Sequence, residues 1–220
     1  METKRVVVTG GGIISALGND WPTALKIVQM VLAGKVSKTL VNLLEMKGGH
    51  AVGISGLDGR LIEARMKDPR LGYVGEITEI NIAPVRDLLD KGYIPVVSTL
   101  GCDDEGNTYN INGDTAAARI AGALGAERMI LMTDIAGILR DKNDPSSLIP
   151  EVTVTEAGRL REEGIVSGGM IPKVECCVEA IRRGVKKVII MDGRVPHSIL
   201  MELLTDEGAG TMVVGEEKEK

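Results

Sequence analysis

Two short segments of the sequence combine residue types that can hold a phosphoryl group during its transfer. Asn110-Ile-Asn-Gly-Asp114 supplies an amide and a carboxylate, and Ser167-Gly-Gly-Met-Ile-Pro-Lys173 supplies backbone N–H groups and a lysine. Both segments stand where a helix is predicted to begin, and helix N-termini attract anions. Phosphoryl transfer depends on positioning and on cations that stabilise the developing charge. These residues therefore indicate a phosphotransferase, with Lys173 and Asp114 as candidate catalytic residues.

Each of these residues also has a purely structural interpretation. Asp114 precedes an alanine-rich helix and is equally suited to cap the N-terminus of that helix. Lys173 could be an ordinary surface lysine, although a positive charge in the first turn of a helix opposes the helix dipole and is not expected to stabilise it. Glycines such as Gly168 and Gly169 at the start of a helix are a weak signal by themselves.

A third candidate segment follows a predicted buried strand that ends at Thr133. Thr133 and Asp134 could contact a ribose or a phosphate, and Gly137 would let the backbone pass close to a ligand. The alternative interpretation is an ordinary β-turn after a strand. The sequence around this segment alone does not separate the two.

The composition argues against several classes of function. The net charge is −5 and only 2% of the residues are aromatic, so a nucleic-acid-binding surface is not expected. The three cysteines, of which Cys176 and Cys177 are adjacent, fit small buried apolar residues in a reducing compartment better than a disulfide framework or a metal site. Glycines 10–12 interrupt the first apolar run, which argues against a membrane-spanning helix there. We therefore expect a cytoplasmic protein without a membrane or nucleic-acid partner.

Strands and helices are predicted to alternate along most of the chain, which favours an α/β fold with a mainly parallel, open sheet whose ligands bind at the carboxyl ends of the strands. Two consecutive strands within residues 59–80 predict a local antiparallel hairpin. The predicted strands are Arg5–Thr9, Ala51–Ser55, Leu61–Met66, Tyr73–Ile80, Ile94–Thr99, Arg128–Thr133, Lys187–Met191 and Thr211–Val214. The predicted helices are Thr23–Lys47, broken near Gly34, and Pro84–Lys91, Thr115–Leu124, Glu156–Glu163, Met170–Arg183 and His197–Thr205.

From about residue 27 to residue 214 the sequence resembles the acetylglutamate kinases of the amino-acid kinase family. The resemblance implies a three-layer α/β sandwich with a mainly parallel open sheet, forming one structural domain overall. Its expected parts are an atypical segment 1–25, a shortened acyl-amino-acid-binding lobe 26–125 and an ATP-binding lobe 126–220. The matching segments are Met30–Lys38, Ala51–Gly56, Leu71–Gly75, Gly92–Val96, Thr108–Asp114, Thr133–Gly137, Ser167–Lys173 and His197–Thr211.

The resemblance also implies a reaction, the ATP-dependent phosphorylation of the side-chain carboxylate of N-acetyl-L-glutamate in arginine biosynthesis, with Mg²⁺ bridging the ATP phosphates. Asn110 would bind the substrate, Asp114 would orient the catalytic lysines, and Lys173 would stabilise the transferring phosphoryl group. No general base is required, because the acceptor is already a carboxylate at neutral pH. The implied nucleotide-binding residues are Asp134, Ile135, Ala136, Gly137, Ile138, Leu139, Ile165, Val166 and Ser167.

The C-terminal part resembles the arginine-inhibited branch of the family, in which this region helps to bind the end product. His197, Glu207 and Gly208 are therefore candidate residues for an L-arginine effector site. A histidine at the start of a helix is also common for structural reasons alone. The family resemblance further implies a homo-oligomer, either a dimer or a hexamer.

The first quarter of the chain departs from the family pattern. The family's Lys-x-Gly-Gly strand and its substrate-binding arginine have no counterpart, and residues 4–20 resemble the N-terminus of a β-ketoacyl synthase, which suggests a truncated or fused chain. The backbone N–H groups of Gly11 and Gly12 could still form a substrate-binding loop, or these glycines could belong to an ordinary strand-to-helix turn.

Three other functions stand beside the kinase. The missing lysine and arginine favour a catalytically impaired remnant that binds nucleotide or arginine. A condensing enzyme is disfavoured because no nucleophilic cysteine motif with two histidines follows the N-terminal segment. A Rossmann dehydrogenase is disfavoured because residues 10–12 lack the Gly-x-Gly-x-x-Gly spacing and the acidic residue that should follow about twenty residues later.

Overall fold

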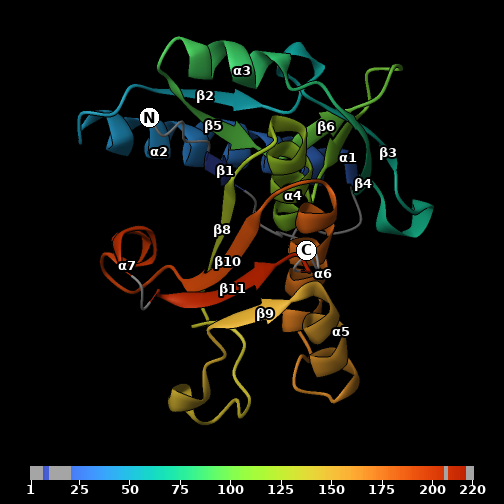
Figure 1. The fold of residues 1–220 in the computed structure, drawn as a ribbon. Helices are drawn as coiled ribbons and strands as arrows, with labels where there is room; N and C mark the ends of the chain where they lie inside the picture. Colours follow the sequence, from blue (N-terminus) through green and yellow to red (C-terminus); the bar gives the residue numbers. More distant parts are fainter. Residues whose placement is uncertain (1–6, 10–20, 206–207, 217–220) are drawn as a thin grey trace. The chain divides into compact units, whose positions relative to one another are not determined.

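The computed structural model describes residues 7–9, 21–205 and 208–216 and divides the chain into two compact units, Met1–Ile120 and Ala121–Lys220 (Figure 1). The helices and the π-helix of the first unit are α1 (Trp21–Gln29), η1 (Met30–Val36), α2 (Ser37–Glu45), α3 (Ala83–Asp90) and α4 (Gly113–Leu124), which continues into the second unit. Its strands are β1 (Val7–Thr9), β2 (Ala51–Ser55), β3 (Ile62–Met66), β4 (Gly75–Ile80), β5 (Ile94–Ser98), β6 (Leu100–Cys102) and β7 (Thr108–Asn110). The second unit contains β8 (Arg128–Thr133), β9 (Glu151–Thr153), α5 (Val154–Glu162), α6 (Met170–Arg182), β10 (Lys187–Asp192), α7 (Ser198–Leu204) and β11 (Gly210–Val214).

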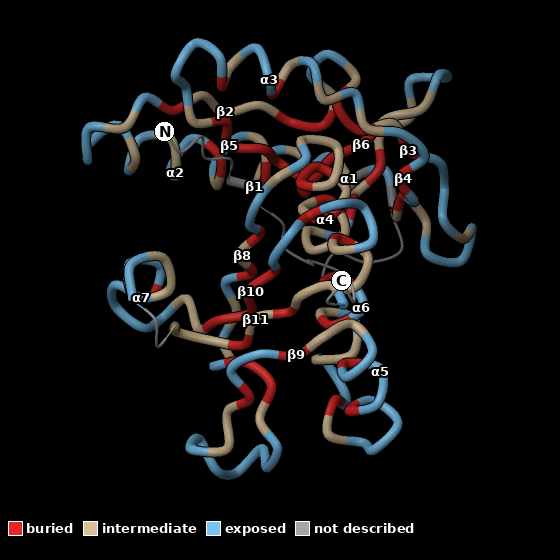
Figure 2. The backbone as a smooth tube through the Cα atoms, viewed as in Figure 1, coloured by how far each residue is buried: buried red, intermediate tan, exposed pale blue. Residues whose placement is uncertain are grey.

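A parallel three-stranded sheet, in the order β1-β5-β2, forms the centre of the first unit. Val96 and Val97 of the central strand β5 are fully buried, so both faces of this strand are covered (Figure 2). On one face the Ser98 hydroxyl donates to Leu32 O at 3.1 Å, which places the long N-terminal helix there, and α3 lies on the opposite face (Figure 1). The prediction of parallel strands between helices is therefore confirmed.

The long helix that covers this sheet is continuous from α1 through η1 to α2. The predicted break near Gly34 is wrong, because the chain passes through a π-helical segment, Met30–Val36, and keeps helical backbone angles on both sides of it. Val28 and Leu32 are buried on the sheet, and the next buried residue, Ser37, comes five positions later. A π-helix has more residues per turn than an α-helix, so a step of five residues returns to the same face of the helix. The parts of the helix before and after the π-helical segment therefore both face the sheet.

A second sheet of the first unit, in the order β4-β3-β6-β7, leads to the start of α4. Its β3–β4 pair is antiparallel, as the sequence predicts, and the connecting turn needs Gly72 at a φ of +60°. The strands β6 and β7 were not predicted. They are three residues long each and pair antiparallel with one another, and β7 ends at Asn110.

The second unit is built on the sheet β8-β10-β11-β9, in which β8 and β10 are parallel and β11 runs antiparallel to β10. Every residue from Val188 to Met191 is buried, so β10 has the continuous apolar pattern of a strand covered on both faces. The helix α6 packs on β10 and β11 through the buried residues Val174, Cys176, Cys177 and Ala180. The prediction that the adjacent cysteines are small buried residues is confirmed.

One helix in the described part of the chain, Ala24–Glu45, is long and apolar enough to cross a membrane by length and composition alone. This is weak support for a membrane span, since core helices and signal sequences have the same properties. Its buried residues Val28 and Leu32 pack against Leu100, as in a helix that covers a sheet.

Candidate active site

The start of α4 carries the first group of predicted site residues. Asn110 ends β7, and its backbone N–H donates to Tyr73 O at 2.8 Å. Its side-chain Oδ1 is buried, and among the described residues it has no hydrogen-bond partner. Buried polar atoms are rarely left without a partner, because each such atom costs about 1–3 kcal/mol. A ligand that donates a hydrogen bond to Asn110 would remove this cost.

Thr99 shares this property and was not singled out in the sequence. It is fully buried, and its Oγ1 has no hydrogen-bond partner in the described part of the chain. Its backbone O accepts from Ile111 N–H at 3.0 Å, so Thr99 lies beside the segment that begins with Asn110. A threonine directly after a β-strand is so common that its residue type gave no signal. Only the burial of a hydroxyl without a partner identifies it.

Asp114 lies in the first turn of α4, but the N-cap interaction of this helix comes from another residue. Asn112 Oδ1 accepts from Thr115 N–H at 3.0 Å and from the Thr115 hydroxyl at 3.2 Å. Asn112 O also accepts the first helical hydrogen bond, from Ala116 N–H. The alternative that Asp114 is the N-cap of the helix is therefore wrong, and its carboxylate is half-buried in the first turn instead.

The second group lies at the start of α6. Gly168 adopts a φ of +55°, which favours glycine, and Met170 N–H donates to Ser167 O at 3.1 Å in the turn that opens the helix. Within the described residues no side chain caps α6. Lys173 stands half-buried in the first turn. The result is a helix N-terminus with a cation beside it, which is a suitable environment for a phosphate.

The third group lies at the carboxyl ends of β8 and β10. In the predicted nucleotide segment Asp134–Leu139, Asp134 and Ala136 are exposed while Gly137 and Ile138 are buried. Arg194 Nη2 donates to Asp134 O at 2.6 Å. Hydrogen bonds from the Arg194 side chain and backbone lower the pKa of Asp192 to about 2, so this carboxylate stays charged and holds the guanidinium. We refer to residues 134–139 as the nucleotide turn.

The remaining predicted residues have different environments. Ser167 is exposed and Ile165 half-buried, but the Val166 side chain is buried, so only its backbone could contact a ligand. His197 has a left-handed φ of +62° just before α7, and Gly208 has a φ of +68°. Gly11, Gly12 and Glu207 lie outside the described residues.

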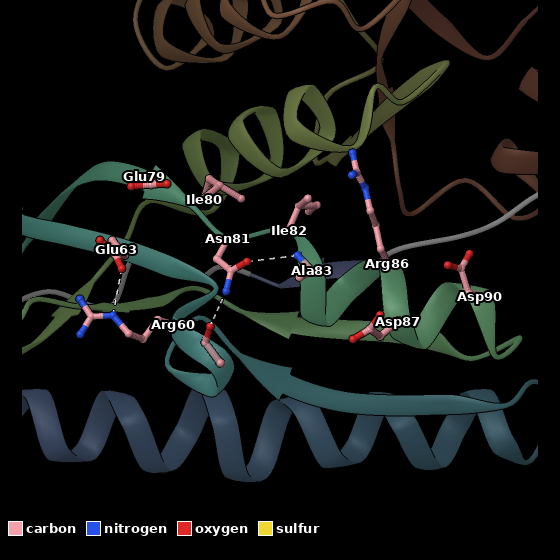
Figure 3. Close-up of a pocket in the computed structure, with 11 residues that line it drawn as sticks. Arg60, Glu63, Glu79, Ile80, Asn81, Ile82, Ala83, Arg86, Asp87 and Asp90 are labelled. Carbon is pink, nitrogen blue, oxygen red and sulfur yellow. Dashed lines mark hydrogen bonds and ion pairs between the residues drawn. The ribbon is translucent and has the colours of Figure 1, made fainter.

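A pocket of about 660 Å³ on the first unit does not coincide with any predicted site residue (Figure 3). It is lined mainly by polar side chains from η2 (Asp58–Arg60), β3, the end of β4 and α3. Several of these groups bind one another: Arg60 Nε donates to Glu63 at 2.9 Å, and Asn81 Nδ2 donates to Gly59 O at 2.8 Å. We assign no ligand to this pocket.

The sequence was compared with known proteins. The family described as "Amino acid kinase family" matches residues 2–192. Acetylglutamate kinase from Thermosynechococcus vestitus is 53% identical over 192 residues, covering 87% of this chain and 65% of the relative. Acetylglutamate kinase from Clostridium beijerinckii is 53% identical over 228 residues, covering 96% of this chain and 80% of the relative. The chain spans about two thirds of the length of the first of these relatives.

Solved structures agree with the sequence comparison. N-acetylglutamate synthase from Neisseria gonorrhoeae, complexed with coenzyme A and N-acetyl-glutamate, is 29% identical with a TM-score of 0.77, covering 89% of this chain and 45% of that chain. The same synthase complexed with coenzyme A and L-arginine gives a TM-score of 0.66 at 29% identity, over 76% of this chain and 38% of that chain. The family match extends over most of the sequence. This chain belongs to the amino acid kinase family.

Proposed function

We propose that this chain is a kinase that transfers the γ-phosphoryl group of ATP to the side-chain carboxylate of N-acetyl-L-glutamate. Two relatives that share about half of its residues carry the name acetylglutamate kinase. The observation that carries the proposal is the buried Asn110 Oδ1 without a hydrogen-bond partner among the described residues, shortly before a helix that has Asp114 in its first turn. N-acetylglutamate has an amide N–H that could donate to this oxygen.

In the proposed reaction a carboxylate oxygen of the acceptor forms a bond to the γ-phosphorus of ATP. The bond from this phosphorus to the β–γ bridging oxygen breaks, and ADP leaves with that electron pair. Lys173 stabilises the negative charge on the transferring phosphoryl oxygens, and Asp114 is the second proposed catalytic residue. The proposed nucleotide-binding residues are those of the nucleotide turn, Asp134–Leu139, together with residues 165–167.

Mg²⁺ would accompany the nucleotide. No group of three or more His, Cys, Asp or Glu side chains that could hold a metal is present in the described residues. This fits a magnesium ion bound mainly by the ATP phosphates and water, an arrangement that Mg²⁺ commonly adopts. When bound there it would neutralise charge on the β- and γ-phosphates.

Further partners and location belong to the same proposal. L-arginine is the proposed feedback inhibitor at a site that includes His197 and Gly208, supported by the arginine complex of the related synthase. Self-association into a homo-oligomer is supported by exposed apolar side chains at Met30 and Leu43 on the long helix and at Met46 directly after it. Three free cysteines are consistent with a reducing, cytoplasmic location.

Radiolabel transfer from γ-labelled ATP to acetylglutamate tests the proposal directly. Asn110→Ala and Thr99→Val should each raise the KM for acetylglutamate about tenfold while changing the KM for ATP less than twofold, because each removes one polar contact to the acceptor. Thr108→Ala, a change on the same strand as Asn110, is the control. ATP binding without any transfer would instead support the alternative of an impaired remnant, which the names of the relatives do not favour.

A further inference from the structure

The nucleotide turn has one side exposed and the other packed on β11. A β-carbon at position 137 would lie 2.5 Å from Thr211 Oγ1 and 2.8 Å from Leu148 Cδ1. Both distances are shorter than real contacts allow, and Gly137 also has a φ of +149°. Glycine is therefore required for the turn to lie directly against Thr211.

The Thr211 hydroxyl joins three separate pieces of the second unit. Thr211 belongs to β11 and is fully buried. Its Oγ1 accepts from Ile138 N–H at 2.8 Å and donates to Ile149 O at 2.7 Å. The hydroxyl proton and a lone pair are both used, so one side chain connects β11, the end of the nucleotide turn and the segment that returns toward β9.

The beginning of the turn has a second anchor. Arg194 Nη2 donates to Asp134 O at 2.6 Å, while Asp192 holds the same guanidinium through Nε at 3.0 Å and Nη2 at 2.8 Å. The Arg194 side chain is 70% exposed, unlike Thr211. The turn is thus held at one end from the surface and at the other from the core, with the exposed Ala136 between the two anchors.

We propose that Thr211 is a positioning residue for nucleotide binding, because its hydroxyl fixes the end of the nucleotide turn, with Arg194 fixing the beginning. Thr211 does not contact the nucleotide itself, since it lies beneath the turn. The inference rests on the proposed function, which assigns ATP to this turn. Its general reason is that a ligand binds more tightly to a loop that is already ordered in the bound conformation.

Three variants separate positioning from simple stability. Thr211→Val keeps the shape but leaves Ile138 N–H and Ile149 O without their partner, and should weaken binding of ATP with Mg²⁺ at least tenfold in calorimetry. Thr211→Ser retains the hydroxyl and should bind within threefold of the wild-type chain. Val213→Ala is the matched control: it lies on the same face of β11, is equally buried, and pairs with Val188 and Val152 of the two neighbouring strands.

Two further measurements make the test independent of folding and of the proposed function. Arg194→Gln, at an exposed position, should weaken ATP binding at least threefold while leaving the melting temperature within about 2 °C of the wild-type value. Amide hydrogen exchange at Ile138 should accelerate at least tenfold in Thr211→Val and less than threefold in Val213→Ala.

Equal weakening of ATP binding in Val213→Ala and Thr211→Val would overturn the inference, as would unchanged binding or unchanged Ile138 exchange in Thr211→Val. If the wild-type chain binds no ATP, the proposed function fails and the nucleotide role of Thr211 fails with it. The Ile138 exchange would then still report whether Thr211 fixes the turn.

Discussion

Lys173 stands where a positive charge is unfavourable for its own helix, in the first turn of α6. Its position is therefore not explained by helix stability, and a loss of activity in a folded variant will report on chemistry. We expect Lys173→Ala to lower kcat by about a hundredfold or more and to change the KM for ATP only a few fold, because the cation acts on charge that develops in the transition state.

Steady-state kinetics of Lys173→Ala beside Lys186→Ala checks this expectation. Lys186 is an exposed lysine of the same unit whose Nζ lies 4.0 Å from a Glu127 carboxylate oxygen. Unchanged turnover in an active Lys173→Ala preparation would remove this lysine from the reaction.

Variants of Asp114 and Asn112 distinguish a catalytic role from helix capping, because Asn112 supplies the N-cap interaction of α4. Asn112→Ala should lower the free energy of unfolding by about 1 kcal/mol and leave the KM for both substrates nearly unchanged. Asp114→Asn should fold normally and lose most of its activity, since an amide lacks the negative charge that the proposed catalytic role requires. Thermal denaturation and kinetics of both variants distinguish these results. An active Asp114→Asn enzyme would argue against the proposed role.

The candidate site residues that the sequence predicted are residue types that are uncommon at their positions in a helix or turn. A lysine in the first turn of α6 and an Asn-x-Asn-Gly-Asp run are visible without a structure. Thr99 and Thr211 could not be predicted, because threonine is ordinary in or next to a strand. Their distinguishing features are a buried hydroxyl without a partner and a buried hydroxyl shared by three segments, and both depend on residues distant in the sequence.

Among the secondary-structure elements, the sequence predicted best those with long patterns of their own. The strands β2 and β8 begin and end at the predicted residues, since their apolar and β-branched runs are five and six residues long. The strands β6, β7 and β9 have three residues each and were missed. So short a run has no recognisable period, and only its pairing with neighbouring strands makes it a strand.

The β6–β7 connection places the Asp103 carboxylate in hydrogen-bond contact with the Asn107 side chain and the Tyr109 hydroxyl. The Asn107 side chain and the Tyr109 hydroxyl, at 2.7 Å, lower the pKa of Asp103 from 3.8 to about 2, and Asp103 raises the pKa of Tyr109 to about 12. The Asp103 carboxylate therefore contributes stability above pH 3.8 that is lost as the pH falls from 3.8 toward 2. For Tyr109 the contribution is complete below pH 10 and is lost between pH 10 and 12.

Tyr109→Phe should raise the pKa of Asp103 toward its ordinary value, because one of the two largest hydrogen bonds to the carboxylate is removed. An NMR titration of the Asp103 carboxyl carbon measures this change. Tyr93→Phe, at a partly exposed tyrosine, is the control and should leave that pKa unaltered. An Asp103 pKa that stays near 2 in Tyr109→Phe would mean that the hydrogen bonds from Asn107 and from the Glu105 backbone N–H hold the carboxylate without Tyr109.

The sequence correctly predicted the α/β class, the parallel pairing and the family. The substrate-binding lobe 26–125 and the ATP-binding lobe 126–220 stay a prediction, and the two compact units of the structure divide between Ile120 and Ala121, inside α4. We continue to propose a substrate-binding and an ATP-binding lobe for the two parts of the chain.

The π-helical segment Met30–Val36 affects whether the long helix can tolerate the loss of one residue during evolution. A one-residue change inside an α-helix turns everything beyond it by about 100°, and would normally remove an apolar face from its sheet. Here the five-residue step from Leu32 to Ser37 already contains one residue more than an α-helical step. A lineage could therefore lose a codon in this segment and keep both halves of the helix on the sheet.

Deletion of Gly34 should accordingly convert the segment to an α-helix and change the melting temperature by less than about 3 °C, while insertion of one alanine beside Gly34 should lower it by 5 °C or more. Thermal denaturation of the two variants measures the difference. Equal destabilisation by both changes would show that the segment holds no spare residue. If the asymmetry is found, Met30–Val36 is a place where this chain can become shorter but not longer.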